Sequence, residues 1–177
     1  MTTLLAIDGA LSSSGYAVVD LTENRLIHLG WVKTSQKNTR AERLHQIHEQ
    51  MLLLRNTYTP DVVVMEDQIF RRNVKTLKSM SQAGGVCMVS FHDIPIVLYT
   101  PKEIKLSVVG KGTASKEEVA HFVYQEYKED SCLQSFLSEL HIPYPFSEKH
   151  IKKINDITDA IGIAITYINR QRTASNG

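Results

Sequence analysis

The chain has 177 residues, 42% of them hydrophobic and 22% charged, with a formal net charge of +1 at pH 7. This is enough for one well-buried core, so we expect a single domain over residues 1–177. No apolar run approaches the roughly 20 residues of a membrane helix, and the N-terminus lacks a basic region followed by a hydrophobic stretch, so we expect a cytoplasmic protein without membrane contact. The two cysteines lack zinc-finger spacing, and we expect them to be reduced and without a chemical role.

Residues 4–19 predict a β-hairpin. An apolar run ends on Asp8, a turn rich in Gly and Ser follows, and a second apolar run returns. Asp8 has two interpretations: it bonds turn amides, as Asp does in many turns, or it belongs to a group of acids that meet in space. Residues 25–33 predict a third strand that continues the meander.

The next segments predict a helix, a strand and a second helix. The first helix begins after Thr39 as its N-cap and ends at about Asn56. Residues 61–66 form a β-branched run typical of a strand buried on both faces, and this run also ends on a carboxylate, Glu66. Residues 73–91 predict a helix whose small residues suit a contact with another helix, in the same chain or in another subunit.

The middle of the second half predicts one short strand and several helices. Residues 94–99 form the strand, and a helix capped by Thr100 follows and ends near Gly110. A capping box predicts another helix over residues 115–127, and residues 133–140 form a short amphipathic segment. Residues 141–147 are the least regular stretch and predict a surface loop.

The last helix is predicted to begin near Asn155 or Asp156 and to end at about Arg172. Asp156 and Asp159 are three residues apart, so both carboxylates project from one side of its first turn. Acids at a helix start can simply complement the helix dipole. Because the rest of this helix is strongly apolar, two adjacent acids are also candidates for a functional pair.

Four carboxylates on three elements suggest one shared site. If the strands ending on Asp8 and Glu66 are parallel neighbours, and the last helix lies over them, these acids meet Asp156 and Asp159 at one edge of the sheet. Uncompensated, they would repel and raise each other's pKa, and a divalent cation relieves this repulsion. Oxygen ligands favour Mg²⁺ or Mn²⁺ over zinc. Because two such ions can drive phosphodiester hydrolysis, that reaction is our prediction.

In their order along the chain, these motifs resemble the RuvC family of Holliday junction resolvases. The segments that carry the resemblance are Asp8 with Ser14-Gly15-Tyr16, then Glu66, then Val108-Val109-Gly110-Lys111-Gly112 with Lys116, and finally Asp156-Ile157-Thr158-Asp159-Ala160. The resemblance covers nearly the whole chain. It implies an α/β, RNase H-like fold with a central five-stranded mixed sheet flanked by helices, a homodimer, and Mg²⁺-dependent paired nicking of strands across a four-way DNA junction.

The resemblance also implies roles for particular residues. The four acids match the family's metal-binding positions, where we expect Mn²⁺ to substitute for Mg²⁺. Lys105 and Lys116 match basic positions near the scissile phosphate, where a cation offsets developing charge. In the family an aromatic residue after the second acid can wedge into the junction, and Phe70 is the candidate here, with Ile69 as the alternative. The basic residues expected to bind DNA around the acids are Arg71, Arg72, Lys75, Lys78 and Lys111.

The chain departs from the family pattern in several places. The family commonly has Asp-Pro-Gly after the first strand, whereas this chain has Asp8-Gly9-Ala10, and Asp67 adds an acid beside the site. The segment from about 128 to 153 is longer than in the bacterial enzymes. This divergence resembles phage-borne relatives, so we expect a bacterial or phage-infected cell and a relaxed sequence preference. The helix over residues 75–91 is predicted to supply much of the dimer contact.

Three other functions can be compared with these sequence features. Sugar-kinase and actin-like ATPases also open with a strand-terminal Asp, but they need a second domain, and Gly110-Lys111-Gly112-Thr113 lacks the Walker spacing. A broader nuclease that cuts forks, flaps and three-way junctions stays open as the main alternative. A junction-binding protein without catalysis would predict a missing acid, yet all four acids are present.

Overall fold

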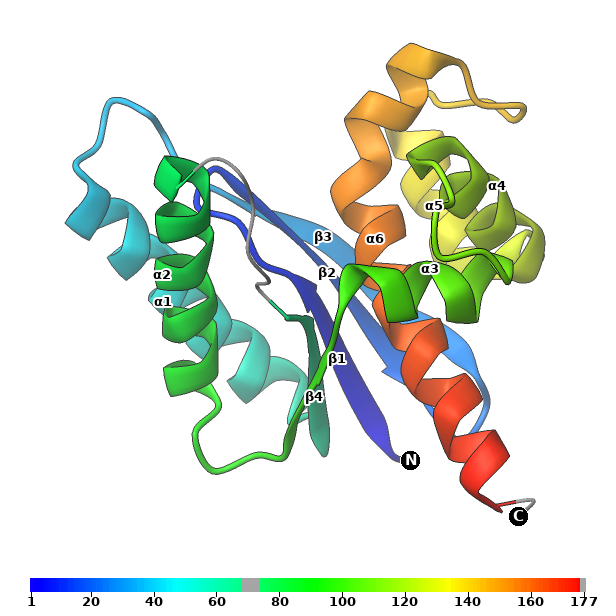
Figure 1. The fold of residues 1–177 in the computed structure, drawn as a ribbon, viewed down its shortest axis with the longest axis horizontal. Helices are drawn as coiled ribbons and strands as arrows, with labels where there is room; N and C mark the ends of the chain where they lie inside the picture. The colour runs from blue at the N-terminus through cyan, green and yellow to red at the C-terminus, as the bar shows by residue number, and fades with distance from the viewer. Residues whose placement is uncertain (68–73, 176–177) are drawn as a thin grey trace.

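A five-stranded mixed β-sheet lies at the centre of the fold, with helices on both faces (Figure 1). The computed structural model describes residues 1–67 and 74–175. The strands are β1 Thr3–Asp8, β2 Ser13–Asp20, β3 Arg25–Lys33, β4 Val62–Glu66 and β5 Ile96–Tyr99, and they lie in the order β3-β2-β1-β4-β5. The helices are α1 Arg40–Tyr58, α2 Val74–Ser90, α3 Pro101–Val109, α4 Lys116–Tyr127, α5 Ser131–Glu139 and α6 Glu148–Ser175. This is the mixed sheet flanked by helices that the sequence predicted.

Strand β1 occupies the middle of the sheet. Its residues 4–7 have no exposed surface, because strands flank it on both sides and helices cover both of its faces. It pairs antiparallel with β2 and parallel with β4. The parallel pairing brings the last residues of β1 and β4, Asp8 and Glu66, to the same edge of the sheet. The predicted neighbourhood of these two strands is confirmed.

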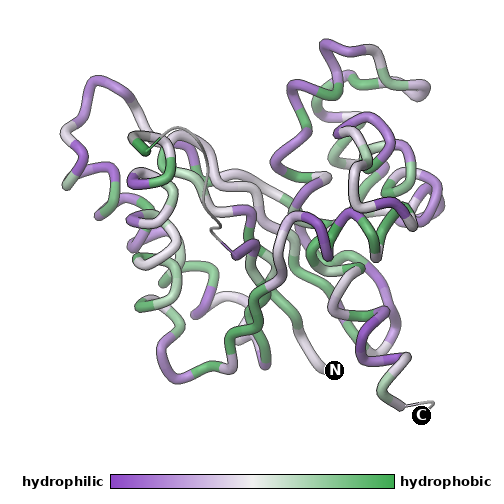
Figure 2. Tube along the Cα trace, in the orientation of Figure 1, coloured by the Kyte–Doolittle hydropathy of each residue, from purple (hydrophilic) through white to green (hydrophobic). Residues whose placement is uncertain are grey.

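Each face of the sheet carries its own hydrophobic layer. On one face, α1 and α2 contribute Ile47 and Cys87 to a layer with Ile7 of β1. On the other face, Ile161 of α6 lies in a layer with Ala6 of β1, α3 and α4 pack against α6, and α5 packs against β3 (Figure 1). Hydrophobic colour runs through the strands and the middle of α6 in Figure 2. Helix α6 is therefore held over the strands by apolar contacts along its length.

Three helices begin at the N-cap residues predicted from the sequence, and all three starts are capping boxes, of which only the one at Ser115 was predicted. Thr39 caps α1, Thr100 caps α3 and Ser115 caps α4, and in each case the hydroxyl oxygen accepts a hydrogen bond from the backbone N–H three residues ahead. Gly110 ends α3 with a φ of 76°, a left-handed conformation that glycine adopts without strain. These signals fix the starts of α3 and α4, the two helices that pack against α6.

The start predicted for the last helix is wrong: α6 begins at Glu148, about two turns earlier than expected. The Ser147 hydroxyl accepts a hydrogen bond from His150 N–H at 3.3 Å, and Ile151 and Ile154 continue the buried face. The acidic pair therefore lies inside α6, not at its first turn, and does not serve as its cap. Neither α6 nor any other helix within residues 1–67 and 74–175 has the length and apolar character needed to span a membrane.

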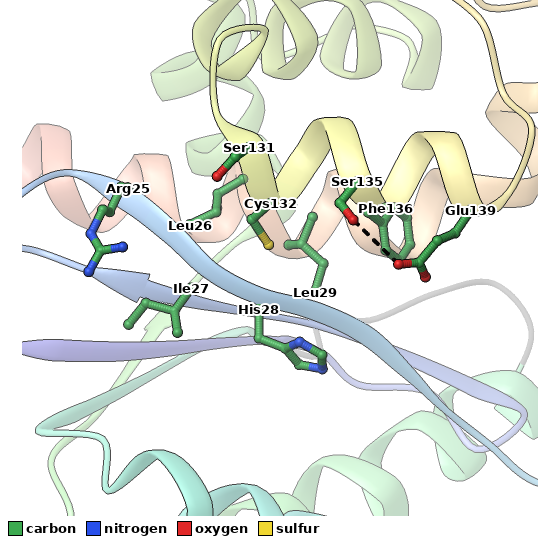
Figure 3. Close-up of a pocket in the computed structure, with 10 residues that line it drawn as sticks. All are labelled: Arg25, Leu26, Ile27, His28, Leu29, Ser131, Cys132, Ser135, Phe136 and Glu139. Atoms are coloured by element: carbon green, nitrogen blue, oxygen red, sulfur yellow. Dashed lines mark hydrogen bonds between the residues drawn. The ribbon is translucent and has the colours of Figure 1, made fainter.

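Helix α5 covers the free edge of β3. Asp130 at the start of α5 accepts a hydrogen bond from Leu26 N–H at 2.9 Å, which occupies a backbone donor of the edge strand. Figure 3 shows Leu26 and Leu29 directed toward α5, and Ile27 and His28 directed to the other side of the strand. The hollow between strand and helix has a volume of about 530 Å³. Covering an edge in this way limits its pairing with other chains.

The backbone of α6 lies very close to the sheet at Gly15 of β2. A Cβ atom added to Gly15 would lie 2.1 Å from the backbone oxygen of Asp156, whereas one added to Gly9 would lie 3.8 Å from Met65 Cε. The first distance is a severe overlap with backbone that cannot rotate away. Only glycine at position 15 lets α6 approach this closely and deliver Asp156 to the sheet.

We predict that Gly15→Ala destabilises the fold, because α6 must move away from β2. The expected loss of unfolding free energy is about 1–3 kcal/mol, the usual cost of overpacking, measured by urea denaturation. Gly9→Ala is the matched control and should leave stability within about 1 kcal/mol of wild type. Equal stabilities of the two variants would contradict the close packing of β2 and α6.

Candidate active site

The four acids singled out in the sequence converge on one pocket of about 310 Å³. Asp8 and Glu66 reach it from the neighbouring ends of β1 and β4, and Asp156 and Asp159 reach it from α6. Lys105 of α3 and Lys116 of α4 line the same pocket. Its apolar lining includes Ala10, Met80, Ile104 and Val119. Carboxylates distant in the sequence thus share a partly apolar hollow with two cationic side chains.

Asp8 is the acid most strongly affected by this environment. Its pKa is raised well above the ordinary value, first because the carboxylate is removed from water. The carboxylates of Asp159, Glu66 and Asp156 raise the pKa further, in that order, and the Lys116 ammonium opposes them. The negative form of Asp8 is therefore disfavoured in the protein alone, and added positive charge would stabilise it.

The pKa of Asp159 is also raised, but its carboxylate has a cationic partner. Burial raises its pKa, and the Asp156 carboxylate acts in the same direction. The ammonium of Lys116, with Nζ 3.3 Å from Asp159 Oδ2, lowers the pKa, and Lys105 does so more weakly. Lys116 is the first residue of α4, so the cap at Ser115 also positions its ammonium beside the acids. Lys105 and Lys116 both line the pocket with the four acids.

Two hydrogen bonds hold the Asp156 carboxylate. Ser13 Oγ donates to Oδ2 at 2.6 Å, and Asn155 Nδ2 donates to Oδ1 at 2.6 Å. Ser13 and Asn155 were not among the site residues predicted from the sequence. The small-residue turn before Gly15 was visible in the sequence, but the contact joins residues 143 positions apart and needs the packing of β2 on α6. Such partners fix the direction in which a carboxylate presents its oxygens.

The residues predicted to bind DNA differ in position. Lys111 lies on the exposed surface, where its Nζ is 3.4 Å from Glu118 Oε1, and it does not line the pocket. Lys78 is exposed on α2. The remaining candidates lie outside the described residues, or, in the case of Lys75, have a side chain outside the description; they are Ile69, Phe70, Arg71, Arg72 and Lys75.

The donor chemistry of the pocket fits a hard divalent cation. Its acidic groups offer only oxygen atoms, which Mg²⁺ and Mn²⁺ prefer, and the raised pKa of Asp8 marks a local excess of negative charge. Within the described part of the chain, no three His, Cys, Asp or Glu side chains already form a finished ligand cage. The Asp156 carboxylate is held by its hydrogen bond from Ser13, and the Asp159 carboxylate by its ion pair with Lys116.

Comparisons with known proteins agree with this arrangement. The family model "Crossover junction endodeoxyribonuclease RuvC" matches residues 4–133. The RuvC of Dictyoglomus turgidum is 31% identical over 172 residues, covering 95% of this chain and 97% of that protein. The solved Thermus thermophilus RuvC structure matches with a TM-score of 0.74 at 26% identity, over 98% of this chain and 97% of that one. RuvC of the same organism in complex with a Holliday junction substrate has a TM-score of 0.74 at 24% identity, over 98% and 96%. The predicted RNase H-like fold is confirmed.

We predict that Asp8→Asn stabilises the metal-free protein at pH 7. Because the folded-state pKa of Asp8 is raised, its contribution to stability is full below the unfolded pKa of about 3.9 and is lost as pH rises. Removing the charge should raise the Tm in EDTA by roughly 2–5 °C at pH 7, and the gain should vanish near pH 4. A divalent cation should raise the wild-type Tm more than that of the variant.

Glu129→Gln is the control for this experiment, since it removes an exposed carboxylate away from the pocket. Its Tm in EDTA should equal that of the wild type. An Asp8→Asn variant less stable than wild type in EDTA at pH 7 would show that the carboxylates do not repel as described.

Proposed function

The chain belongs to the RuvC family of crossover junction endodeoxyribonucleases, and we propose that it resolves Holliday junctions by paired nicking of DNA strands through phosphodiester hydrolysis. The observation that carries this proposal is the single pocket that gathers Asp8, Glu66, Asp156 and Asp159 with two lysines. Members of the family depend on divalent metal ions. For this chain we propose Mg²⁺, with Mn²⁺ able to substitute, because all the candidate ligands are carboxylate oxygens.

The proposed metal ligands are the four acids. A bound cation would stabilise the negative form of Asp8 in particular, because the pKa of this residue is raised well above its ordinary value. When bound, divalent cations supply the positive charge that makes a water nucleophilic and stabilises the leaving oxygen of a phosphodiester. Ser13 and Asn155 keep the Asp156 oxygens directed into the pocket. The apolar lining from Met80, Ile104 and Val119 limits water around the acids and strengthens each electrostatic interaction there.

Lys105 and Lys116 are proposed to stabilise negative charge on the scissile phosphate. Both ammonium groups belong to the pocket, and that of Lys116 already faces a carboxylate, Asp159. A phosphate entering the pocket offers Lys116 a second anionic partner at the point where charge develops. The lysines therefore offset the negative charge of the acids before DNA binds, and that of the scissile phosphate once DNA is bound.

DNA contacts are proposed on both sides of the pocket. Phe70, or Ile69, is the proposed wedge at the junction centre, because the segment directly follows the pocket acid Glu66. Lys111 is exposed and, among the described residues, pairs only with the surface carboxylate of Glu118, a contact of little energetic value that a DNA phosphate can replace. The full set proposed to contact the DNA backbone is Arg71, Arg72, Lys75, Lys78 and Lys111. Because its substrate is DNA, we place the protein in the cytoplasm of a bacterial or phage-infected cell.

A homodimer through α2 would present two such pockets to the two-fold symmetric junction. Met88 and Val89 are 41% and 66% exposed, and a Cβ added to Gly85 would meet nothing within 4 Å. These positions are three and four residues apart and so share one helix face, which is open in the single chain. We propose that this face contacts its copy, and that residues 1–177 act as one nuclease domain within the dimer.

The cleavage prediction uses labelled four-way, three-way, forked and linear duplex DNA with Mg²⁺ or EDTA. Wild type should make symmetric nicks in the four-way junction, with Mg²⁺ only. Asp8→Asn should keep junction binding and lose about 1,000-fold or more in cleavage rate, since it removes a ligand of the charge-stabilising ions. Lys128→Ala, an exposed change far from the pocket acids in sequence, should cut normally.

Comparable cutting of forks and three-way junctions would favour the broader branched-DNA nuclease. Junction binding without any cleavage in Mg²⁺ or Mn²⁺ would favour a non-catalytic binding protein. Wild-type cleavage by Asp8→Asn would contradict the proposed metal site.

The dimer prediction concerns the exposed face of α2. Val89→Glu should weaken subunit association roughly 100-fold, because a buried carboxylate would face an apolar partner surface. Sedimentation at micromolar concentration should then give a dimer for wild type and a monomer for the variant. Leu106→Glu, which changes a 52% exposed leucine on α3, should stay dimeric. A monomeric wild type would overturn the proposed dimer.

A further inference from the structure

The first two turns of α6 carry lysines on the same helix face as the acidic pair. Helix α6 begins eight residues before Asp156, and Lys149, Lys152, Asp156 and Asp159 follow one another at spacings of three, four and three. Residues at these spacings lie above one another on one face of a helix. The buried positions of this stretch, Ile151, Ile154 and Ile157, point to the core, so the two lysines are on the exposed side.

The side chains of Lys149 and Lys152 make few contacts within the protein and are available to bind a ligand. Among the described residues, Lys149 has no hydrogen bond or ion pair, and Lys152 pairs only with Glu148 at i and i+4. Both members of that pair are more than 70% exposed, and an exposed pair of this kind contributes little. Lys153 instead donates to the Leu140 carbonyl at 3.2 Å and fixes the turn before α6.

The surrounding surface is also basic. The three lysines line a groove of about 490 Å³ with His141 and His150. We call residues 148–153 of α6 the basic extension. Figure 1 shows its turns (orange) standing clear of the sheet.

The distances of the two lysines from Asp156 along α6 are comparable with the axial spacing of phosphates in duplex DNA. With a rise of 1.5 Å per residue, Lys152 lies about 6 Å and Lys149 about 10 Å along the axis from Asp156. One strand of B-DNA advances about 3.4 Å per phosphate along the duplex axis, so a DNA arm lying along α6 places two to three phosphates within this length. Lysines at these positions reach phosphates next to the one held at the acids.

We propose that Lys149 and Lys152 of the basic extension bind backbone phosphates of the DNA arm, two to three nucleotides from the cleaved bond. This inference rests on the proposed nuclease function and deepens it. It gives a role to the segment from 128 to 153, because α5 and the Lys153 contact with Leu140 hold the extension in place. Contacts of this kind position DNA and read no bases, so they serve any junction sequence.

The test compares Lys149→Ala/Lys152→Ala with a control, Lys128→Ala/Arg172→Ala, which removes the same charge elsewhere. Junction binding is titrated in EDTA over a range of salt, and cleavage is timed in Mg²⁺. Loss of two phosphate contacts should reduce the slope of log Kd against log salt by about 2 and raise the half-saturating junction concentration roughly tenfold. The cleavage rate at saturation should stay within about twofold of wild type, and the control should match wild type in every measurement.

A gain variant and a modified substrate sharpen the test. Glu148→Gln frees Lys152 from its carboxylate, so it should bind junctions more tightly than wild type. A neutral methylphosphonate placed two or three nucleotides from the mapped nick should weaken binding of wild type and of the control, and leave the double variant unaffected.

The outcomes distinguish a failure of this inference from a failure of the proposed nuclease function. If wild type binds and cuts junctions but the double variant and the control have equal salt slopes, the inference alone fails. A lower saturating rate with an unchanged salt slope would also overturn it. If wild type neither binds nor cuts junctions, the proposed function and this inference fall together.

Discussion

The mutual repulsion of four carboxylates is the constraint on which the rest of the structure depends. Parallel pairing of β1 and β4 fixes two of them at one sheet edge, and the close contact of α6 with Gly15 brings the other two over it. The fold holds them together although burial and like charge raise the pKa of Asp8 and Asp159. Hydrophobic layers on both faces of the sheet outweigh this cost.

Positive charge is distributed around the acids at increasing distance. Lys116 lies within 3.3 Å of Asp159, Lys105 lines the same pocket, and the basic extension of α6 continues outward from the acidic pair. A DNA strand is negative along its whole length, so it meets cations at the cleaved phosphate and beyond it. In the proposed function, α6 thus carries both two of the metal ligands needed for cleavage and the lysines that align the DNA strand.

Much of this arrangement was visible in the sequence, because its signals are local. Apolar runs that end on Asp8 and Glu66 predicted strands with acids at one edge, and N-cap residues predicted the starts of three helices. The start of α6 was predicted about two turns too late, because Asn155 and Asp156 are residue types that commonly begin a helix. Ser147 ends the loop as a cap, and the isoleucines after it keep the helical register. The partners of Asp156 were missed for another reason: the contact with Ser13 exists only after β2 and α6 have packed.

The proposed metal site is tested most directly by locating bound Mn²⁺ in crystals of the protein through its anomalous scattering. We expect a peak about 2 Å from carboxylate oxygens of Asp8 and of at least one acid of α6, because these groups need the charge most. Mn²⁺ bound only elsewhere on the surface, with the four carboxylates left apart, would contradict the claim that their repulsion is relieved by a shared metal ion.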